Sequence, residues 1–402
     1  MVGGAFLSRV GRGPVLIGVA SVALLVGYVE VWAARAVTHG FVAYYAAARL
    51  LITGQLGPHV YDDKWFQVHV QQLTRSGVLE IFGPNPPTMA LIAVPVAWID
   101  HATARHVWLI ASVGCLIAAM GALLLYADVT DGSRVPLIII ALLLLNPAVF
   151  ANLRTGQAYL VVFALLTGAV LGLLRGRDRV AGAFLGLALA LKSSGLALFV
   201  MLLARRRWTA VATATVIVLG CIVVVAALGD SRAWLAYLSY VPEFVARPAA
   251  STTAYQTTLG LFRRLCVADA TWNPSPAANC GPLATLIPAL MLGAALLVTI
   301  VLALRAPARL WVAAGVCLSE LTLPVAAEQH FVLLGIPLVL LWPNRGSSRL
   351  LLGAAITLLL VPLDYTAHRF TEGWGALLAY PRLYAAWLVW VAAAMAMYRS
   401  RS

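Results

Sequence analysis

The chain has 402 residues, of which 62% are hydrophobic and only 11% are charged, and its mean hydropathy is +0.91. A soluble protein of this length needs far more charge to cover its surface, so the composition excludes a soluble globular protein. The net charge of +13 comes mainly from arginines in separate loops, so we expect no nucleic-acid partner.

Hydrophobic runs follow one another along almost the whole chain. A helix needs about 20 apolar residues to cross a bilayer, and several of the runs are shorter than this. They predict twelve candidate spans, at 14–34, 106–127, 135–150, 158–174, 180–191, 195–204, 208–229, 283–305, 310–325, 331–343, 349–366 and 382–398. We therefore expect an all-α polytopic membrane protein in which residues 1–402 form a single transmembrane domain.

The first run, 14–34, also resembles a signal peptide, because Arg9 and Arg12 precede it as a basic n-region would. Its apolar stretch is about 20 residues long, whereas the apolar region of a signal peptide usually has about 7–15. We therefore expect a retained membrane anchor.

Basic clusters flank the stretch 180–204, with three arginines at 175–179 and three more at 205–207. If both clusters are cytoplasmic, the stretch enters the membrane and returns, and residues 192–195 (Lys-Ser-Ser-Gly) mark the bend. Non-helical backbone at that depth is tolerated only inside protein or beside a watery cavity.

The distribution of arginine also predicts the orientation. Besides the two clusters, the loops assigned to the inside carry Arg9, Arg12, Arg134, Arg305, Arg309, Arg345, Arg349, Arg399 and Arg401. Short loops rich in Lys and Arg mark the cytoplasmic side. We expect a multi-pass protein of the plasma (inner) membrane, with both termini cytoplasmic and the active site facing the periplasm or exterior.

Two long segments then lie outside, at 35–105 and 230–282. In the first, the amphipathic stretch 44–52 and the polar stretch 62–75 predict helices on the membrane surface. The apolar stretch 88–99 is too short to span and predicts a helix embedded in the outer leaflet.

Cys266 and Cys280 both fall in the second external segment. They predict either a disulfide, which an oxidising periplasm would permit, or two free thiols. The chain has no CxxC pair, so we expect no metal site.

An enzyme that faces outward has no nucleotide-activated donor at hand, so its donor would be lipid-linked. A polyprenyl-phosphate donor needs a groove open to lipid, a cation for the phosphate and a base for the acceptor hydroxyl.

Four short motifs stand at the predicted outer ends of the spans. They are GFVAYYAAARLL at 40–51 with Tyr61 and Asp62; NPPTMAL at 85–91 with Pro95; TGQ at 155–157 with Lys192; and QTTLG at 256–260 with Arg263, then EQH at 328–330 and Pro337.

In order and spacing, these motifs resemble glycosyltransferase family 87, the polyprenol-phosphate-mannose-dependent α-mannosyltransferases and their relatives. The resemblance covers about 40–340. It implies the C-type membrane glycosyltransferase architecture, no cofactor, and inverting transfer of a sugar from a polyprenyl-phosphate-linked donor to a lipid or glycan acceptor on the outer face.

One position departs from the family pattern. Members usually carry an aspartate directly before the Phe of the first motif, where it is the expected base, and this chain has Gly40 there. Glu30, Asp62, Asp63 and Asp100 are other acids near the outer face, and His39 adjoins the lost position. We expect Asp62 or Asp63 to act as the base; the alternative is that Asp62 caps a surface helix.

Lys192 stands in an otherwise apolar stretch, where an ionisable residue predicts a function, and we expect it to bind the donor phosphate. His330 is a second catalytic candidate, because the family usually carries His at this point. The expected substrate-binding residues are Lys192, Arg154, Gln157, Tyr44, Asn85, Gln256, Arg263 and Glu328. Arg264 and the buried acid Glu320 are further candidates.

Two other functions compete with the enzyme. A transporter or flippase of a lipid-linked sugar would often show inverted repeats, and none is detectable in the sequence. A catalytically silent family member is the third hypothesis, because Gly40 lacks the usual acid.

Overall fold

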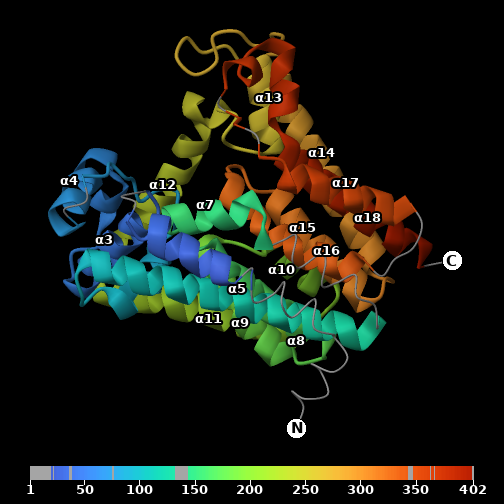
Figure 1. Ribbon diagram of the computed structural model, residues 1–402, viewed down its shortest axis with the longest axis horizontal. Helices are drawn as coiled ribbons and strands as arrows, with labels where there is room; N and C mark the ends of the chain where they lie inside the picture. Colours follow the sequence, from blue (N-terminus) through green and yellow to red (C-terminus); the bar gives the residue numbers. More distant parts are fainter. Residues whose placement is uncertain are drawn as a thin grey trace.

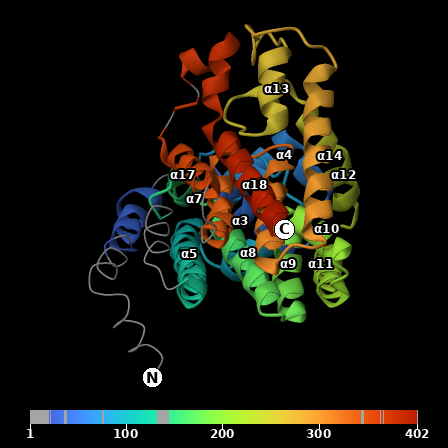
Figure 2. The ribbon, with the colours of Figure 1, turned by 90° about the vertical axis from the view of Figure 1, so that its right-hand side faces the viewer.

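A computed structural model describes residues 20, 22–35, 39–74, 77–131, 144–342, 347–362, 364–365 and 367–400. The regular elements of these residues are helices (Figures 1 and 2). The α-helices are α3 (Phe41–Ile52), α4 (Asp63–Thr74), α5 (His101–Asp131), α7 (Pro147–Thr155), α8 (Tyr159–Leu174), α9 (Asp178–Lys192), α10 (Leu196–Ala204), α11 (Trp208–Leu228), α12 (Arg232–Ala246), α13 (Thr258–Cys266), α14 (Leu283–Ala303), α15 (Ala308–Leu321), α16 (Gly335–Leu341), α17 (Ser347–Leu360) and α18 (Pro381–Arg399). Short π or 3-10 turns are η1 (Val29–Ala33), η2 (Pro58–Tyr61), η3 (Pro87–Val96), η4 (Pro248–Ser251), η5 (Glu328–Leu334), η6 (His368–Phe370) and η7 (Gly373–Ala379).

Three of the described helices are long and apolar enough to cross a membrane: α11, α14 and the part of α5 from His101 to Ala127. A fourth span results if η7 and α18, which meet at a bend of 58°, count as one. The prediction of an all-α membrane protein is confirmed, whereas the number of twelve spans stays a prediction. Most of the predicted span 135–150 lies outside the described residues.

One group of helices, α5, α8, α9 and α11, runs side by side along the lower edge of Figure 1. Glycines bring α9 close to both of its neighbours. A Cβ on Gly182 would lie 2.4 Å from the carbonyl oxygen of Ala210 in α11, and one on Gly172 of α8 would lie 3.0 Å from the backbone of Ala181. Small residues at such crossings give close van der Waals packing, which is the main attraction between helices in lipid.

A second group, α14, α17 and α18, leads upward in Figure 1 toward α13. Figure 2, turned by 90°, shows α18 and α14 on the same side of the molecule as α13. A disulfide joins Cys266, at the end of α13, to Cys280, just before α14. The structure therefore selects the disulfide over the two free thiols.

The segment 39–100 contains the three predicted helices, as α3, α4 and η3. The helix predicted at 44–52 is not exposed, because ten of the twelve residues of α3 are buried inside the protein; its place at the membrane surface stays a prediction. Four of those ten are alanines at 43 and 46–48, and their small side chains let α3 pack closely against η3 and α5.

The break expected at 192–195 is confirmed, whereas the return of this stretch to the same side of the membrane stays a prediction. Helix α9 ends at Lys192 and α10 begins at Leu196, with Ser193 at φ 52° and Gly195 at φ 90° between them. This left-handed turn ends α9, so the Lys192 side chain comes from the last turn of a helix.

Candidate functional site

A cavity of about 440 Å³ lies where residues from α3, α8–α10, α12, α15 and η5 meet the segment 80–86. It brings together five of the predicted site residues, which come from distant parts of the sequence: Tyr44, Asn85, Gln157, Lys192 and His330. Together with Glu80 and Tyr159, these side chains give the cavity a cation, a carboxylate, two phenols, two amides and an imidazole.

Lys192 is the cation of this cavity. Its Nζ donates to Oδ1 of Asn85 at 2.6 Å and lies 4.9 Å from the ring centre of Tyr44 and 5.1 Å from that of Tyr159. Nδ2 of Asn85 donates to the carbonyl oxygen of Phe82 at 2.5 Å, which turns Oδ1 toward the lysine. Among the described residues no carboxylate forms an ion pair with Nζ, so this charge has one hydrogen bond and two aromatic faces.

Tyr44 and Gln157 form one wall. The Tyr44 hydroxyl donates to Oε1 of Gln157, which leaves the Nε2 amide of Gln157 as a donor on the cavity side. Gln157 follows the left-handed Gly156, whose carbonyl accepts from the indole of Trp108 at 2.9 Å. The turn after α7 is therefore fixed by packing, and Gln157 is held with it.

His330 is buried and both of its ring nitrogens have partners. Nε2 lies 2.5 Å from the hydroxyl oxygen of Tyr159, and Nδ1 lies 3.0 Å from the carbonyl oxygen of Ala327. The rings of Tyr159 and His330 are 4.0 Å apart. The imidazole is consequently fixed in the cavity wall.

Gly40 lies at the edge of the cavity with φ +93°. A Cβ on it would meet the carbonyl oxygen of Thr155 at 2.5 Å and Nε2 of Gln157 at 3.0 Å. Its backbone N–H donates to Oε2 of Glu80 at 2.7 Å, and the same oxygen lies 3.3 Å from Nδ1 of His39. The hydrogen bond between His39 and the Glu80 carboxylate raises the pKa of His39 above its ordinary value.

Asp62 and Asp63, the predicted bases, are not among the residues that line the cavity. Oδ1 of Asp62 accepts from the backbone nitrogens of Lys64 and Trp65, so it caps α4. Asp63 pairs with Arg247 at 2.9 Å and accepts from the Tyr240 hydroxyl at 3.0 Å, which ties α4 to α12.

Glu30 and Asp100, which were also considered as replacements, have structural contacts, whereas Glu320 has none of this kind among the described residues. Glu30 lies 3.2 Å from His106, and Asp100 accepts from the backbone of Thr103 at the start of α5. Glu320 is buried in α15, and neither of its carboxylate oxygens has a hydrogen-bond partner in the described part of the chain.

Four predicted binding residues lie away from the cavity lining. Gln256 and Glu328 contact the buried Arg382: Glu328 forms an ion pair with it at 2.8 Å, and Gln256 Oε1 accepts from its backbone nitrogen at 3.3 Å. Arg263 donates to the carbonyl oxygen of Val245. Arg154 is exposed at the end of α7.

Three residues were not predicted from the sequence: Glu80, Tyr159 and Arg382. Tyr159 stands two residues after the TGQ motif, and this proximity could have identified it. Glu80 is a single acid within the aliphatic and aromatic run 78–82, a pattern that also fits an ordinary surface residue. Arg382 is the first residue of the predicted span 382–398, and its position in the sequence gives no sign of the ion pair with Glu328.

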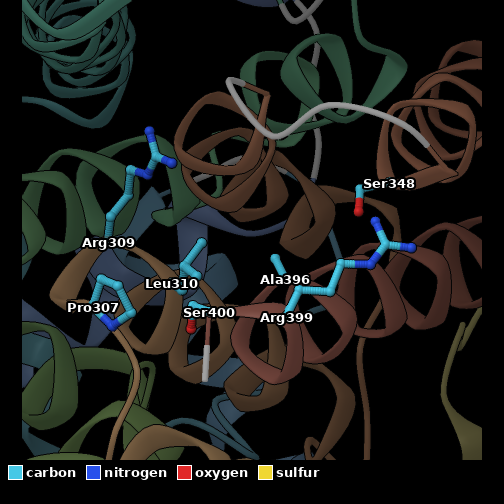
Figure 3. A pocket seen from close by; sticks show the side chains of 7 residues that line it. All are labelled: Pro307, Arg309, Leu310, Ser348, Ala396, Arg399 and Ser400. Atoms are coloured by element: carbon cyan, nitrogen blue, oxygen red, sulfur yellow. The ribbon is translucent and has the colours of Figure 1, made fainter. Parts of the chain in front are cut away.

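A second hollow, of about 340 Å³, lies where the starts of α15 and α17 meet the end of α18 (Figure 3). Its lining residues are Pro307, Arg309, Leu310, Ser348, Ala396, Arg399 and Ser400. Figure 3 shows the two arginines on either side of Leu310 and Ala396. Those lining residues include no aromatic ring and no acid, so the hollow lacks the mixture of groups that the larger cavity has.

The fold and the cavity together define an all-helical membrane protein that encloses a polar, aromatic-lined site. The family model of glycosyltransferase family 87 matches residues 84–326, which is more than half of the chain. The chain therefore belongs to glycosyltransferase family 87, a family of membrane transferases. No curated protein matches it.

Proposed function

We propose that the protein transfers a hexose, with mannose as the first candidate, from a polyprenyl-phosphate donor to a lipid or glycan acceptor, with inversion at the anomeric carbon. The observation that carries the proposal is Lys192, a cation in the wall of a cavity with no anionic partner among the described residues. Family membership supports the transfer of a sugar. Mannose and the lipid carrier rest on the resemblance of the motifs.

The phosphate of the donor supplies the anion that Lys192 lacks. An ammonium group has three donors, and Nζ uses one on Asn85. A phosphate oxygen within hydrogen-bond distance would form a charge-assisted bond, which is about twice as strong as a neutral one. As the C1–O bond breaks, negative charge grows on this phosphate, and Lys192 would stabilise it most at that moment.

The cavity also has walls suited to the rest of the donor. Its apolar part includes Leu196, Val241, Phe244, Val245 and Leu323, which would accept the first isoprene units. On α12, Leu235 and Leu238 are 67% and 63% exposed, as residues that face lipid can be. Nε2 of Gln157 would donate to a sugar hydroxyl.

His330 fits this scheme as a positioning residue, because both of its nitrogens have partners. Through its bond to the Tyr159 hydroxyl it would hold that ring beside Lys192. We therefore propose a positioning role for His330 in place of the catalytic role expected from the sequence.

The arginine distribution supports an orientation in which the cavity opens to the exterior and both termini are cytoplasmic. Cysteine labelling tests it at Gln71 and Ala270, which are exposed residues of the two predicted external segments. The parent for Gln71→Cys and Ala270→Cys has Cys115, Cys221 and Cys317 replaced by alanine. We expect an impermeant maleimide to label both in intact cells; labelling of both only after lysis would reverse the orientation.

The direct test of function uses the purified protein in proteoliposomes with a radiolabelled short-chain polyprenyl-phosphate-mannose. We expect label to pass to acceptors in an envelope lipid extract, and NMR of the product to give the inverted anomer. A deletion strain should lack the same glycolipid in mass spectra of its envelope. Donor that crosses the bilayer unchanged would indicate a transporter, and neither transfer nor movement would indicate a silent family member.

A further inference from the structure

We propose that Glu80 is the catalytic base of this transferase, in place of the acid that Gly40 cannot supply. The inference deepens the proposed function and rests on it. Glu80 belongs to the segment between α4 and η3, and its side chain reaches the cavity edge beside Gly40, 40 residues away in the sequence.

The contacts of Glu80 leave one of its oxygens open to a substrate. Oε2 accepts from the Gly40 backbone N–H at 2.7 Å and lies 3.3 Å from His39 Nδ1. Among the described residues, Oε1 accepts only from the neighbouring Ile81 N–H at 3.0 Å, so it retains a lone pair. The side chain is 15% exposed, and Glu80 is the one carboxylate among the described residues that line the cavity.

Glu80 and the cation that would hold the phosphate line the same cavity. Glu80 and Lys192 do not form an ion pair in the described structure, because Lys192 donates to Asn85 and Glu80 lies against His39 and Gly40. A substrate can therefore come between them, with its phosphate toward Lys192 and the acceptor hydroxyl toward Glu80. An inverting displacement needs this separation of the base from the leaving group.

The absence of a side chain at Gly40 is compatible with the position of the Glu80 carboxylate. An aspartate at position 40 would place its Cβ 2.5 Å from the carbonyl oxygen of Thr155, in a backbone conformation that side chains rarely adopt. The glycine instead brings its N–H against the Glu80 carboxylate. This bond holds Oε2, so Oε1 is the oxygen that would receive the proton.

The reaction balances with these groups. The acceptor oxygen forms a bond to C1 of the sugar while its proton passes to Oε1 of Glu80. The bond from C1 to the phosphate oxygen breaks, and both of its electrons leave with the polyprenyl phosphate. Glu80 then returns its proton to solvent, and the cycle uses no oxidant or reductant.

Kinetics of Glu80 variants in proteoliposomes test the assignment, with short-chain polyprenyl-phosphate-mannose as donor. Glu80→Gln keeps the shape of the side chain and removes the base, so transfer should fall about 100-fold or more while donor affinity stays within about 3-fold of wild type. Glu372→Gln is the matched control, because Glu372 forms an exposed ion pair with His368 at 3.1 Å away from the cavity. It should transfer like wild type.

Chemical rescue separates a base from a merely structural acid. In Glu80→Ala, sodium formate should restore part of the lost transfer, and sodium chloride at the same ionic strength should not. If Glu80→Gln transfers normally, or if formate fails in a Glu80→Ala protein that binds donor, the assignment is wrong while the proposed function stands. If wild type itself transfers nothing, the proposed function fails and the assignment fails with it.

Discussion

Two cations of the described helices, Lys192 and Arg382, have opposite surroundings. Arg382 is 0% exposed, pairs with Glu328 at 2.8 Å and donates to the carbonyl oxygens of Leu358 and Val361. Lys192 donates once, to the neutral amide of Asn85, and otherwise lies against two rings. A charge inside a protein is costly without a partner, and of these two only that of Arg382 is neutralised by a carboxylate within the described protein.

This difference in partners distinguishes a cation with a structural role from one with a ligand-binding role. A charge whose donors all have partners holds helices together: Arg382 joins α18 to η5 and to the end of α17. A charge with donors to spare beside a cavity is suited to an anionic ligand. The surroundings of each cation, more than its burial, therefore indicate its role, and variants of the two should fail in different ways.

The largest effect should follow from Arg382→Met. It leaves the Glu328 carboxylate and two carbonyl oxygens without their partner, which should destabilise the protein by about 3 kcal/mol or more. Thermal unfolding in detergent measures it, with Arg399→Met, at the end of the same helix, as the control for loss of an arginine. A melting temperature equal to that of wild type would contradict the structural role.

Lys192→Met should leave stability nearly unchanged, within about 1 kcal/mol, because it removes one hydrogen bond and a partly unpaired charge. Donor binding should weaken by roughly 1–3 kcal/mol, since a charge-assisted bond is lost. Lys64→Met is the control, because Lys64 is the only other lysine and is exposed on α4. Isothermal titration with the donor that gives equal affinities for the two variants would remove Lys192 from the phosphate site.

Gly40→Ala and Gly40→Asp should both lower stability by about 1–3 kcal/mol and reduce transfer, because any Cβ meets the Thr155 carbonyl. Gly77→Ala separates strain from contact, since Gly77 has φ +68° with nothing within 4 Å of its Cβ position. Gly77→Ala should lower the stability of the protein less than Gly40→Ala does. A Gly40→Asp protein that transfers faster than wild type would show that the family acid can work here after all.

The smallest effect concerns pH. The pKa of His39 is raised by Glu80, so its ion pair stabilises the folded protein below the unfolded pKa of histidine and is lost as pH rises through the raised folded value. Because the His39 side chain is 66% exposed, the gain is well under 1 kcal/mol. His39→Gln should therefore lower the melting temperature slightly at about pH 5 and leave it unchanged at about pH 9. The opposite pH trend would contradict the pairing.

Local patterns in the sequence predicted the features that depend on nearby residues. Hydropathy predicted the helical membrane fold, and the Lys-Ser-Ser-Gly run predicted the bend after α9. The alternative that Asp62 caps a helix was also visible, from a polar stretch that follows it.

Features that depend on the tertiary fold could not be predicted from the sequence. Glu80 comes to Gly40, and Arg382 to Glu328, only when segments 40 and 54 residues apart pack together. The amphipathic appearance of 44–52 predicted a surface helix, yet its alanines pack inside the protein. Periodicity cannot distinguish a face that contacts lipid from one that contacts other helices, because both are apolar.

The most direct test of the account is a cryo-EM structure of the protein in lipid nanodiscs with a non-hydrolysable short-chain polyprenyl-phosphonate-mannose. The account predicts phosphonate density within about 3 Å of Lys192 Nζ, with the sugar between Lys192 and Glu80. Density in the second hollow, beside Arg309 and Arg399, with the larger cavity empty would contradict it.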